Sequence, residues 1–388
     1  MFHLTALPPL SLYVHLPWCV RKCPYCDFNS HEIKDTTVPE QAYVNALIAD
    51  LEQELPSIWG RAVETVFIGG GTPSLFSPEA IDRLLSQLRA LLALPATAEI
   101  TLEANPGTVE TGRFAELRAV GINRLSIGVQ SFDDGMLAKL GRIHGGREAI
   151  AAAEAAHAAG FTEFNLDLMY GLPGQGVEQA LADLEQAIAL QATHLSHYQL
   201  TLEPNTRFAH APPTLPDEDT LWEMQQRCQA RLTERGFENY EVSAYAQAGH
   251  RCRHNLNYWQ FGDYLGIGAG AHAKISSAQT QQIVRSAKQR HPRDYLAKAA
   301  GAERIADHHV LSRHEAGFEF MLNALRLSDG FPVALFAQHT GLPLTIVEAP
   351  LAAAEARGLI ERDMHTIRPT TLGRRFLNDL TAVFLPTN

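Results

Sequence analysis

The chain has 388 residues, of which 46% are hydrophobic and 19% are charged, as expected of a soluble globular protein with two or three domains. Its 32 Lys and Arg residues against 43 Asp and Glu residues give a net charge of −11, which argues against nucleic acid or an anionic membrane surface as the main partner. Since no apolar run reaches the roughly 18 residues of a membrane-spanning helix, we expect no stable membrane insertion.

From residue 11 to about residue 245, short runs rich in β-branched residues alternate with helical stretches rich in alanine and leucine. This alternation is typical of α/β proteins with a parallel sheet. Six βα units can be counted and eight cannot, so residues 1–245 are predicted to form a partial (βα)6 barrel. The predicted strands are Ser11–His15, Val63–Ile68, Glu99–Ala104, Arg124–Val129, Thr162–Leu168 and His194–Thr201. The predicted helices are Glu40–Leu55, Pro78–Leu92, Val109–Val120, Arg147–Ala159, Val177–Leu190 and Asp217–Arg235.

Two further segments follow the predicted barrel. Residues 246–305 are expected to close or connect it, with a functional loop or closing element over Arg251–His272, where aromatic, glycine and polar residues show little periodicity. In residues 306–388, three short helices precede a hairpin of Leu359–Arg362 and Thr366–Pro369, which predicts a C-terminal α+β domain of winged-helix type. This segment has 7 Arg and no Lys against 9 Asp and Glu residues, whereas a wing that binds duplex nucleic acid should be basic.

Three cysteines follow the first predicted strand with the spacing C-x3-C-x2-C, namely Cys19, Cys23 and Cys26. Such clustering favours a metal site in a reducing compartment over a disulfide scaffold and predicts a cytoplasmic protein. The neighbouring Arg21 and Lys22 favour the thiolate form, which binds soft metals. A closed [4Fe–4S] site uses four cysteines, so three would leave one iron open to another ligand. The spacing also permits a structural zinc site completed by His15 or His31.

Polar residues and a glycine run lie at the ends of the next predicted strands. The second strand runs into Gly69-Gly70-Gly71-Thr72, where bare backbone lets a ligand approach and NH groups can bind a carboxylate. Ligands of such sheets bind at the carboxyl ends of the strands. A carboxylate there can accept hydrogen bonds from ribose hydroxyls, and an arginine can pair with a ligand carboxylate. For each residue taken alone, a role as a cap or a surface charge is favoured, and the shared location is what favours a ligand site. The residues concerned are Glu103, Gln130 and Asp167, together with Arg142 twelve residues beyond Gln130.

Together these motifs resemble the radical SAM superfamily, whose signature is C-x3-C-x2-C after the first strand of a partial (βα)6 barrel. The resemblance implies that the three cysteines hold a [4Fe–4S] cluster whose open iron is chelated by S-adenosylmethionine, the source of a 5′-deoxyadenosyl radical. The glycine run resembles the family's GGE-like segment, with Thr72 where glutamate is common. By resemblance, S-adenosylmethionine is contacted by Tyr13, Tyr25, Gly70, Gly71, Thr72, Glu103, Gln130, Arg142 and Asp167, with Gln199 and Gly270 as additions.

Within that superfamily, the chain resembles the oxygen-independent coproporphyrinogen III oxidases and the HemW-type haem chaperones, for example over Arg124–Phe132 and Asp167–Gly174. Two features favour the HemW type. Phe28 stands where the oxidases have a fourth cysteine, and the sequence HNLNYW at residues 254–259 matches an H-N-x-x-Y-W element. The resemblance implies a chaperone that binds haem and delivers it to an apo-haemoprotein acceptor. The alternative is oxidative decarboxylation of coproporphyrinogen III by radical chemistry.

The H-N-x-x-Y-W element is a candidate haem site. His254 offers an imidazole for haem iron, and Tyr258 and Trp259 offer flat faces for a macrocycle. The residues alone favour a structural role, in which His254 fixes a loop and Tyr258 and Trp259 fill the core. The resemblance favours haem binding instead. Rival iron ligands are His272, Cys252, His308 and His309. Because an exposed macrocycle is a sticky surface, we expect a homodimer that depends on ligand. A third interpretation, a zinc-dependent adaptor with a nucleic-acid-binding wing, predicts a colourless protein.

Overall fold

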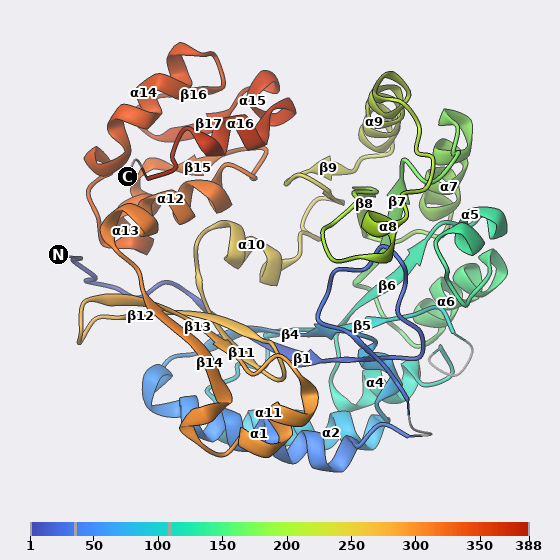
Figure 1. Ribbon diagram of the computed structural model, residues 1–388, viewed down its shortest axis with the longest axis horizontal. Helices are drawn as coiled ribbons and strands as arrows, with labels where there is room; N and C mark the ends of the chain where they lie inside the picture. Colours follow the sequence, from blue (N-terminus) through green and yellow to red (C-terminus); the bar gives the residue numbers. More distant parts are fainter. Residues whose placement is uncertain (1, 35–36, 108–110, 387–388) are drawn as a thin grey trace.

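The computed structural model describes residues 2–34, 37–107 and 111–386 of the chain. Within these residues, one twelve-stranded sheet runs through the larger part of the molecule (Figure 1). Its middle six strands all pair in parallel, which confirms the predicted partial (βα)6 barrel. In spatial order they are β1 (Leu10–Leu16), β4 (Val63–Gly70), β5 (Glu99–Ala104), β6 (Arg124–Gln130), β7 (Phe164–Tyr170) and β8 (His194–Gln199).

Helices between these strands cover the outer face of the barrel, where they bury leucines such as Leu47 and Leu84 against the sheet (Figure 1). The second helix begins at Pro78, and the Ser77 hydroxyl caps it by accepting the Ala80 amide. Residues 109 and 110 of the predicted helix Val109–Val120 lie outside the described residues. The helices are α1 (Glu40–Ile58), α2 (Pro78–Leu91), α4 (Phe114–Val120), α5 (Asp134–Lys139), α6 (Gly146–Ala158), α7 (Val177–Ala189), α8 (Arg207–His210) and α9 (Glu218–Glu234).

On the far side of β1 the sheet continues, and of the two forms expected for Arg251–His272, a loop or a closing element, the loop is wrong. The segment forms α10 (Arg253–Trp259) and β11 (Asp263–Ile267), and β11 pairs in parallel with β1. Glycines conceal the strand pattern in the sequence: a side chain at Gly266 would come within 2.0 Å of the His272 carbonyl oxygen. Three antiparallel strands follow, β12 (His272–Ser277), β13 (Gln282–Lys288) and β14 (Ile305–Val310), with α11 (Pro292–Lys298) between the last two.

Short strands complete the edges of the barrel. After β8, the sheet ends in the antiparallel strands β10 (Ala244–Ala246) and β9 (Glu238–Asn239). Near the cysteines, β2 (Trp18–Cys19) pairs with β3 (His31–Glu32) and fixes both ends of the loop between them. None of the helices described is both long and apolar enough to cross a membrane.

The C-terminal part forms a second body in the order of a winged-helix domain (Figure 1), around a core that Phe261 and Ile283 of the larger body also join. Phe320, Phe331 and Phe336 pack edge-on in this core, with ring centroids 5.0 to 5.1 Å apart. The beginning of the chain joins it: Phe2 is buried there, and the His3 amide donates to the Gly341 carbonyl at 2.8 Å. The elements are α12 (Arg313–Ala324), β15 (Phe331–Pro332), α13 (Val333–Thr340), α14 (Glu348–Ala356), β16 (Ile360–Arg362), β17 (Thr366–Pro369), α15 (Thr371–Arg375) and α16 (Leu377–Ala382).

The predicted boundary between residues 305 and 306 falls within the large sheet, since β14 spans it. The first helix of the smaller body, α12, begins at Arg313, where the Ser312 hydroxyl and the Glu315 carboxylate form a capping box. The change from sheet to helical body therefore occurs over residues 311 and 312.

Candidate metal and ligand-binding site

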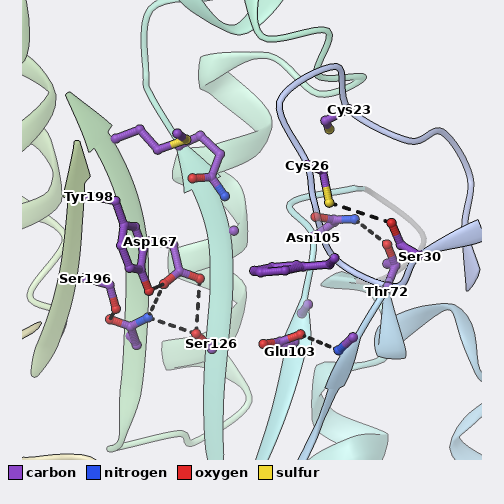
Figure 2. A pocket seen from close by; sticks show the side chains of 18 of the residues that line it. Cys23, Cys26, Ser30, Thr72, Glu103, Asn105, Ser126, Asp167, Ser196 and Tyr198 are labelled. Carbon is purple, nitrogen blue, oxygen red and sulfur yellow. Dashed lines mark hydrogen bonds between the residues drawn. The ribbon is translucent and has the colours of Figure 1, made fainter. Parts of the chain in front are cut away.

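The carboxyl ends of the parallel strands and the cysteine loop surround a cavity of about 370 Å³, called the barrel cavity below (Figure 2). Parallel strands all present their carboxyl ends at one edge of the sheet, so side chains distant in sequence meet there. Most of the predicted site residues line this cavity, namely Cys19, Cys23, Tyr25, Cys26, Gly70, Gly71, Thr72, Glu103, Gln130, Arg142, Asp167 and Gln199.

Hydrogen bonds hold the cysteine loop, and its three thiols form no disulfide. The Lys22 ammonium donates to the carbonyls of Phe28 and Ser30 at 2.9 and 3.2 Å. The Arg142 guanidinium lies 3.6 Å from the Cys23 sulfur, and the Ser30 hydroxyl lies 3.7 Å from that of Cys26. Within the part of the chain described, no three His, Cys, Asp or Glu side chains lie close enough together to hold a single metal ion. A [4Fe–4S] cluster does not require this, because each thiolate binds a different iron.

Burial determines the protonation of the ligand-free thiols. It raises the pKa of Cys19 and Cys26, and the lowering by nearby hydroxyls and by the Lys22 ammonium does not offset it. The Lys22 ammonium lowers the pKa of Cys26, as expected, but burial raises it by more, so the ligand-free Cys19 and Cys26 thiols favour the protonated form. A metal centre that binds here must displace their protons.

The glycine run at the end of β4 allows the strand to pass close to its neighbours. A side chain at Gly71 would lie 2.4 Å from the Trp18 carbonyl oxygen, and Gly70 has a φ of +119°. The amides of Gly70, Gly71 and Thr72 donate to Glu103, to the Leu16 carbonyl and to the Trp18 carbonyl at 2.9, 2.8 and 2.7 Å. These NH groups are therefore not free to bind a ligand carboxylate, contrary to the prediction.

Two carboxyl groups, Glu103 from β5 and Asp167 from β7, face the barrel cavity (Figure 2). Burial and the nearby Asp167 raise the pKa of Glu103 to about 7, although the Gly70 amide acts in the opposite direction. Burial also raises the pKa of Asp167, against hydrogen bonds from Asn165 and Ser126 at 2.8 and 3.2 Å. Neither carboxyl forms an ion pair within the described residues. A ligand that brings positive charge or hydroxyl donors would compensate for their burial.

Arg142 is one of three arginines that line the cavity, together with Arg21 and Arg124. Its Nη2 donates to the Asn105 side chain and to the Gly128 carbonyl at 2.8 and 2.6 Å, while its buried Nε has no hydrogen-bond partner in the described part of the chain. This buried N–H group could donate a hydrogen bond to an acceptor atom of a ligand. Gln130, at the end of β6, has a φ of +71°, a conformation that is uncommon for a residue other than glycine.

Sequence reasoning missed several polar residues of the cavity wall. In β7 and β8, polar residues recur at every second position of otherwise buried strands, so they share one face. That period of two, interrupting an apolar parallel strand, is the signal that could have found them. The residues are Asn105, Ser126, Asn165, Ser196 and Tyr198.

Tyr13 and Gly270 do not line the barrel cavity. They line a second cavity of about 670 Å³, called the tyrosine cavity below, which lies beside the first and shares Phe28, Gly70 and Glu103 with it. The two cavities are thus separated by a few side chains of the cysteine loop and of β4 and β5.

The structure does not bring His254 together with the other predicted residues. Its side chain is 1% exposed, its Nδ1 lies 2.7 Å from the Thr65 hydroxyl, and its amide donates to Glu99 at 3.0 Å. Burial lowers the pKa of His254 to about 3, so the ring is neutral. His254 therefore anchors α10 to β4 and β5 in this conformation and faces neither cavity.

The other candidate iron ligands lie apart from one another. Cys252 is buried, with its sulfur 3.5 Å from Glu99. His308 and His309 are exposed on β14, and His272 is exposed at the start of β12, where it lines the tyrosine cavity. His15, a candidate zinc ligand, lies with both ring nitrogens in hydrogen-bonding distance of the Tyr13 hydroxyl and the Asn29 carbonyl, at 3.0 and 2.9 Å.

Comparison with known proteins gives two family models and a set of relatives. The radical SAM superfamily model matches residues 13–187, and that of the HemN C-terminal domain matches residues 311–376. The protein named heme chaperone HemW from Escherichia coli (strain K12) is 49% identical over 98% of this chain and 100% of that protein. Proteins of the same name from Haemophilus influenzae and Bacillus subtilis are 48% and 33% identical, over 98% and 97% of this chain and 98% and 99% of their own lengths. Among solved structures, coproporphyrinogen III oxidase (HemN) from Escherichia coli matches with a TM-score of 0.82 and 25% identity, over 97% of this chain and 90% of that chain.

Proposed function

The chain belongs to the HemW family of haem chaperones within the radical SAM superfamily, and on this basis we propose that it binds haem and delivers it to apo-haemoproteins. The observation that carries the proposal is the difference between two full-length comparisons. Identity is 49% to the HemW chaperone of Escherichia coli and 25% to the HemN oxidase of the same species. Both comparisons cover nearly the whole chain, so the difference does not come from a missing domain.

Phe28 supports the same choice. It occupies the place of the fourth cysteine that the oxidases carry, and its side chain is 62% exposed. It lines both the barrel cavity and the tyrosine cavity. An exposed aromatic side chain in this position offers an apolar contact to a ligand where an oxidase would have a thiol.

Membership of the radical SAM superfamily implies a [4Fe–4S] cluster and S-adenosylmethionine. The ligands of the cluster are then Cys19, Cys23 and Cys26, whose free thiols line the barrel cavity on a loop fixed at both ends. When bound, the cluster supplies one-electron chemistry and an open iron. The protein holds the thiols in place, and the Arg142 guanidinium beside Cys23 offsets the negative charge of a thiolate.

The residues that contact S-adenosylmethionine are proposed from the same cavity. Glu103 and Asp167 present uncompensated carboxyls, which suit hydroxyl donors and a cationic ligand. The unpartnered Nε of Arg142 suits an acceptor oxygen. The other proposed contacts that line the cavity are Tyr25, Gly70, Gly71, Thr72, Gln130 and Gln199. Tyr13 and Gly270 would act from the neighbouring tyrosine cavity.

We further propose that the cluster and S-adenosylmethionine control assembly and haem release more than they perform radical turnover. The two cavities share a wall, so occupancy of one changes the surroundings of the other. A haem held in a cavity that opens to the surface would also present an apolar edge, which favours a homodimer of the loaded chain.

The experiment that tests the function compares the two candidate activities in one preparation. The cluster is reconstituted anaerobically, S-adenosylmethionine and a reductant are added, and coproporphyrinogen III is supplied while products are followed by mass. We expect no decarboxylated tetrapyrrole. In parallel, haem-loaded protein is mixed with an apo-haemoprotein, and transfer is followed by the absorption spectrum of the acceptor. Loss of carboxyl groups from the substrate, or failure to transfer haem, would contradict the proposal.

A further inference from the structure

The tyrosine cavity is not used by the contacts proposed for the cluster. Its volume of about 670 Å³ is in the range of about 300–1,000 Å³ usual for small-molecule and cofactor sites. It is lined by residues of β1, of β11, which pairs with β1, and of the antiparallel strands β12 to β14 beyond it, and it adjoins the barrel cavity at Phe28, Gly70 and Glu103. A ligand held there would lie next to the cofactors and would share Tyr13 and Gly270 with the contacts proposed for S-adenosylmethionine.

One wall of this cavity is aromatic. Tyr13, Tyr258 and Tyr264 line it, and the rings of Tyr258 and Tyr264 meet edge-on with centroids 4.4 Å apart. The Tyr13 ring stacks on Phe67 at 6.3 Å, which fixes its plane. Several aromatic rings locked against one another form a broad apolar surface that suits a large flat ligand. Tyr258 belongs to the H-N-x-x-Y-W element, so that element contributes to this wall although His254 does not.

The cavity also contains an imidazole that the fold does not use. His272 is the first residue of β12, opposite Ala287 of β13, and both residues line the cavity. Within the described residues, the His272 ring has no hydrogen-bond partner. The other imidazole of the cavity, His15, has contacts at both nitrogens. His272 is therefore free to donate a lone pair to a metal.

The positive charge at the edge of the cavity comes from Arg290. Its side chain is exposed and makes one hydrogen bond in the described part of the chain, from Nε to the Asn29 side chain at 3.3 Å, so its two terminal nitrogens are available. Lys288 also lines the cavity, but its ammonium is buried in ion pairs with Asp50 and Glu54. A guanidinium with two free nitrogens suits a carboxylate.

We propose that the tyrosine cavity is the haem site of this chain, with His272 as the iron ligand and Arg290 paired with a propionate. Tyr258 and Tyr264 contact the macrocycle, and Phe28 separates it from the barrel cavity. The inference rests on the proposed function, because it assigns a place and a ligand to the haem that a chaperone of this family carries. It also explains why His254 can be buried without loss of the site.

The test titrates two probes, haem and metal-free protoporphyrin IX, into anaerobically reconstituted protein while the Soret band is recorded. In His272→Ala we expect an altered Soret band and haem binding weakened by at least about tenfold, with protoporphyrin binding unchanged, since only iron ligation is lost. Arg290→Glu should weaken the binding of both probes. The matched control is His314→Ala, an exposed histidine of α12 that should behave as wild type.

Electron paramagnetic resonance of the haem-loaded variants gives a second readout of the iron ligand, independent of any transfer activity. A His272→Ala variant with a wild-type Soret band, resonance signal and haem affinity would overturn the assignment. Loss of iron ligation in His254→Ala alone would do the same and would place the ligand in α10. If the wild-type chain binds neither probe, the proposed function fails, and the site fails with it. The integrity of each variant is checked by its cluster absorbance.

Discussion

The Gly70 amide donates to the Glu103 carboxyl at 2.9 Å, and this contact lies in the wall that separates the two cavities. It joins the end of β4 to the end of β5, where the bare backbone of the glycine run approaches that carboxyl. The same contact explains why the glycine run cannot offer all its amides to a ligand. This hydrogen bond holds Glu103 in position, but it does not offset the cost of burying the charged carboxylate.

The first prediction concerns Glu103 and pH. Burial raises its pKa from 4.5 to about 7, so the fold favours the protonated form. The ligand-free chain should therefore lose stability as the pH rises from about 4.5 through 7. Glu103→Gln should remove this loss and be more stable than wild type at pH 8 by up to about 3 kcal/mol, with a smaller difference at pH 5. Urea unfolding at both pH values measures it, and Glu116→Gln, at an exposed position of α4, is the control. Equal pH dependence in wild type and variant would contradict the prediction.

The second prediction concerns the cysteines. Replacing any one of Cys19, Cys23 and Cys26 by Ala should prevent retention of a [4Fe–4S] cluster, because the cluster needs all three of these thiolates. Iron and sulfide content and the absorbance at about 400 nm measure the loss. Cys228→Ala is the matched control, since that thiol is fully buried in α9 and does not line either cavity. A full cluster in any of the three variants would remove that residue from the ligand set.

The third prediction concerns the close approach of Gly71. A methyl group there would lie 2.4 Å from the Trp18 carbonyl oxygen, which is backbone and cannot rotate away. Gly71→Ala should therefore lower the free energy of unfolding by at least about 2 kcal/mol and displace the cysteine loop. Gly301→Ala, where the nearest atom would be 3.9 Å away, should change stability by less than about 0.5 kcal/mol. Denaturant titration of the two variants distinguishes them, and equal stabilities would show that β4 adapts.

The fourth prediction concerns His254. Burial lowers its pKa from 6.5 to about 3, so protonation favours the unfolded chain, and the contribution of this group to stability is lost as the pH falls below about 6.5. His254→Ala should lose the contact with Thr65 and ring contacts with Phe67 and Tyr258, at a cost of about 2–4 kcal/mol. The folded variant should keep the wild-type Soret band with haem. Thermal unfolding at pH 5 and pH 8 measures the pH effect, and a His254→Ala variant as stable as wild type would refute the structural role.

The barrel could be predicted because each of its strands is a short apolar run between a helix and a turn. Glu99–Ala104 is predicted to the residue, and the other five strands differ at their ends by one to two residues. The extension through β11 could not be predicted in this way. The apolar pattern of β11 is interrupted by Gly266. The strand pairs with β1, about 250 residues earlier in the chain, and a local sequence pattern does not predict pairing between segments so far apart.

The site was predictable to the extent that its residues stand at strand ends. Glu103 and Asp167 meet in one cavity because parallel strands end at one edge, and Arg142 reaches the same cavity from the segment between α5 and α6. A structural role for His254 is favoured by the residues alone, but the burial of its ring is a tertiary property, since it depends on the packing of Phe67 and Tyr258 around it. The free ring of His272 is likewise a tertiary property: the sequence holds 17 histidines, and their partners emerge only from the fold.

The attachment of the first residues to the C-terminal body has a consequence for cooperativity. Phe2 and Leu4 are buried in the smaller core, β1 begins six residues later in the middle of the large sheet, and β14 leads back from that sheet into α12. The two bodies are therefore connected by covalent chain at two separate points. Neither can loosen without straining the other, so the wild-type chain should melt in a single transition, and removal of the first five residues should split that transition into two.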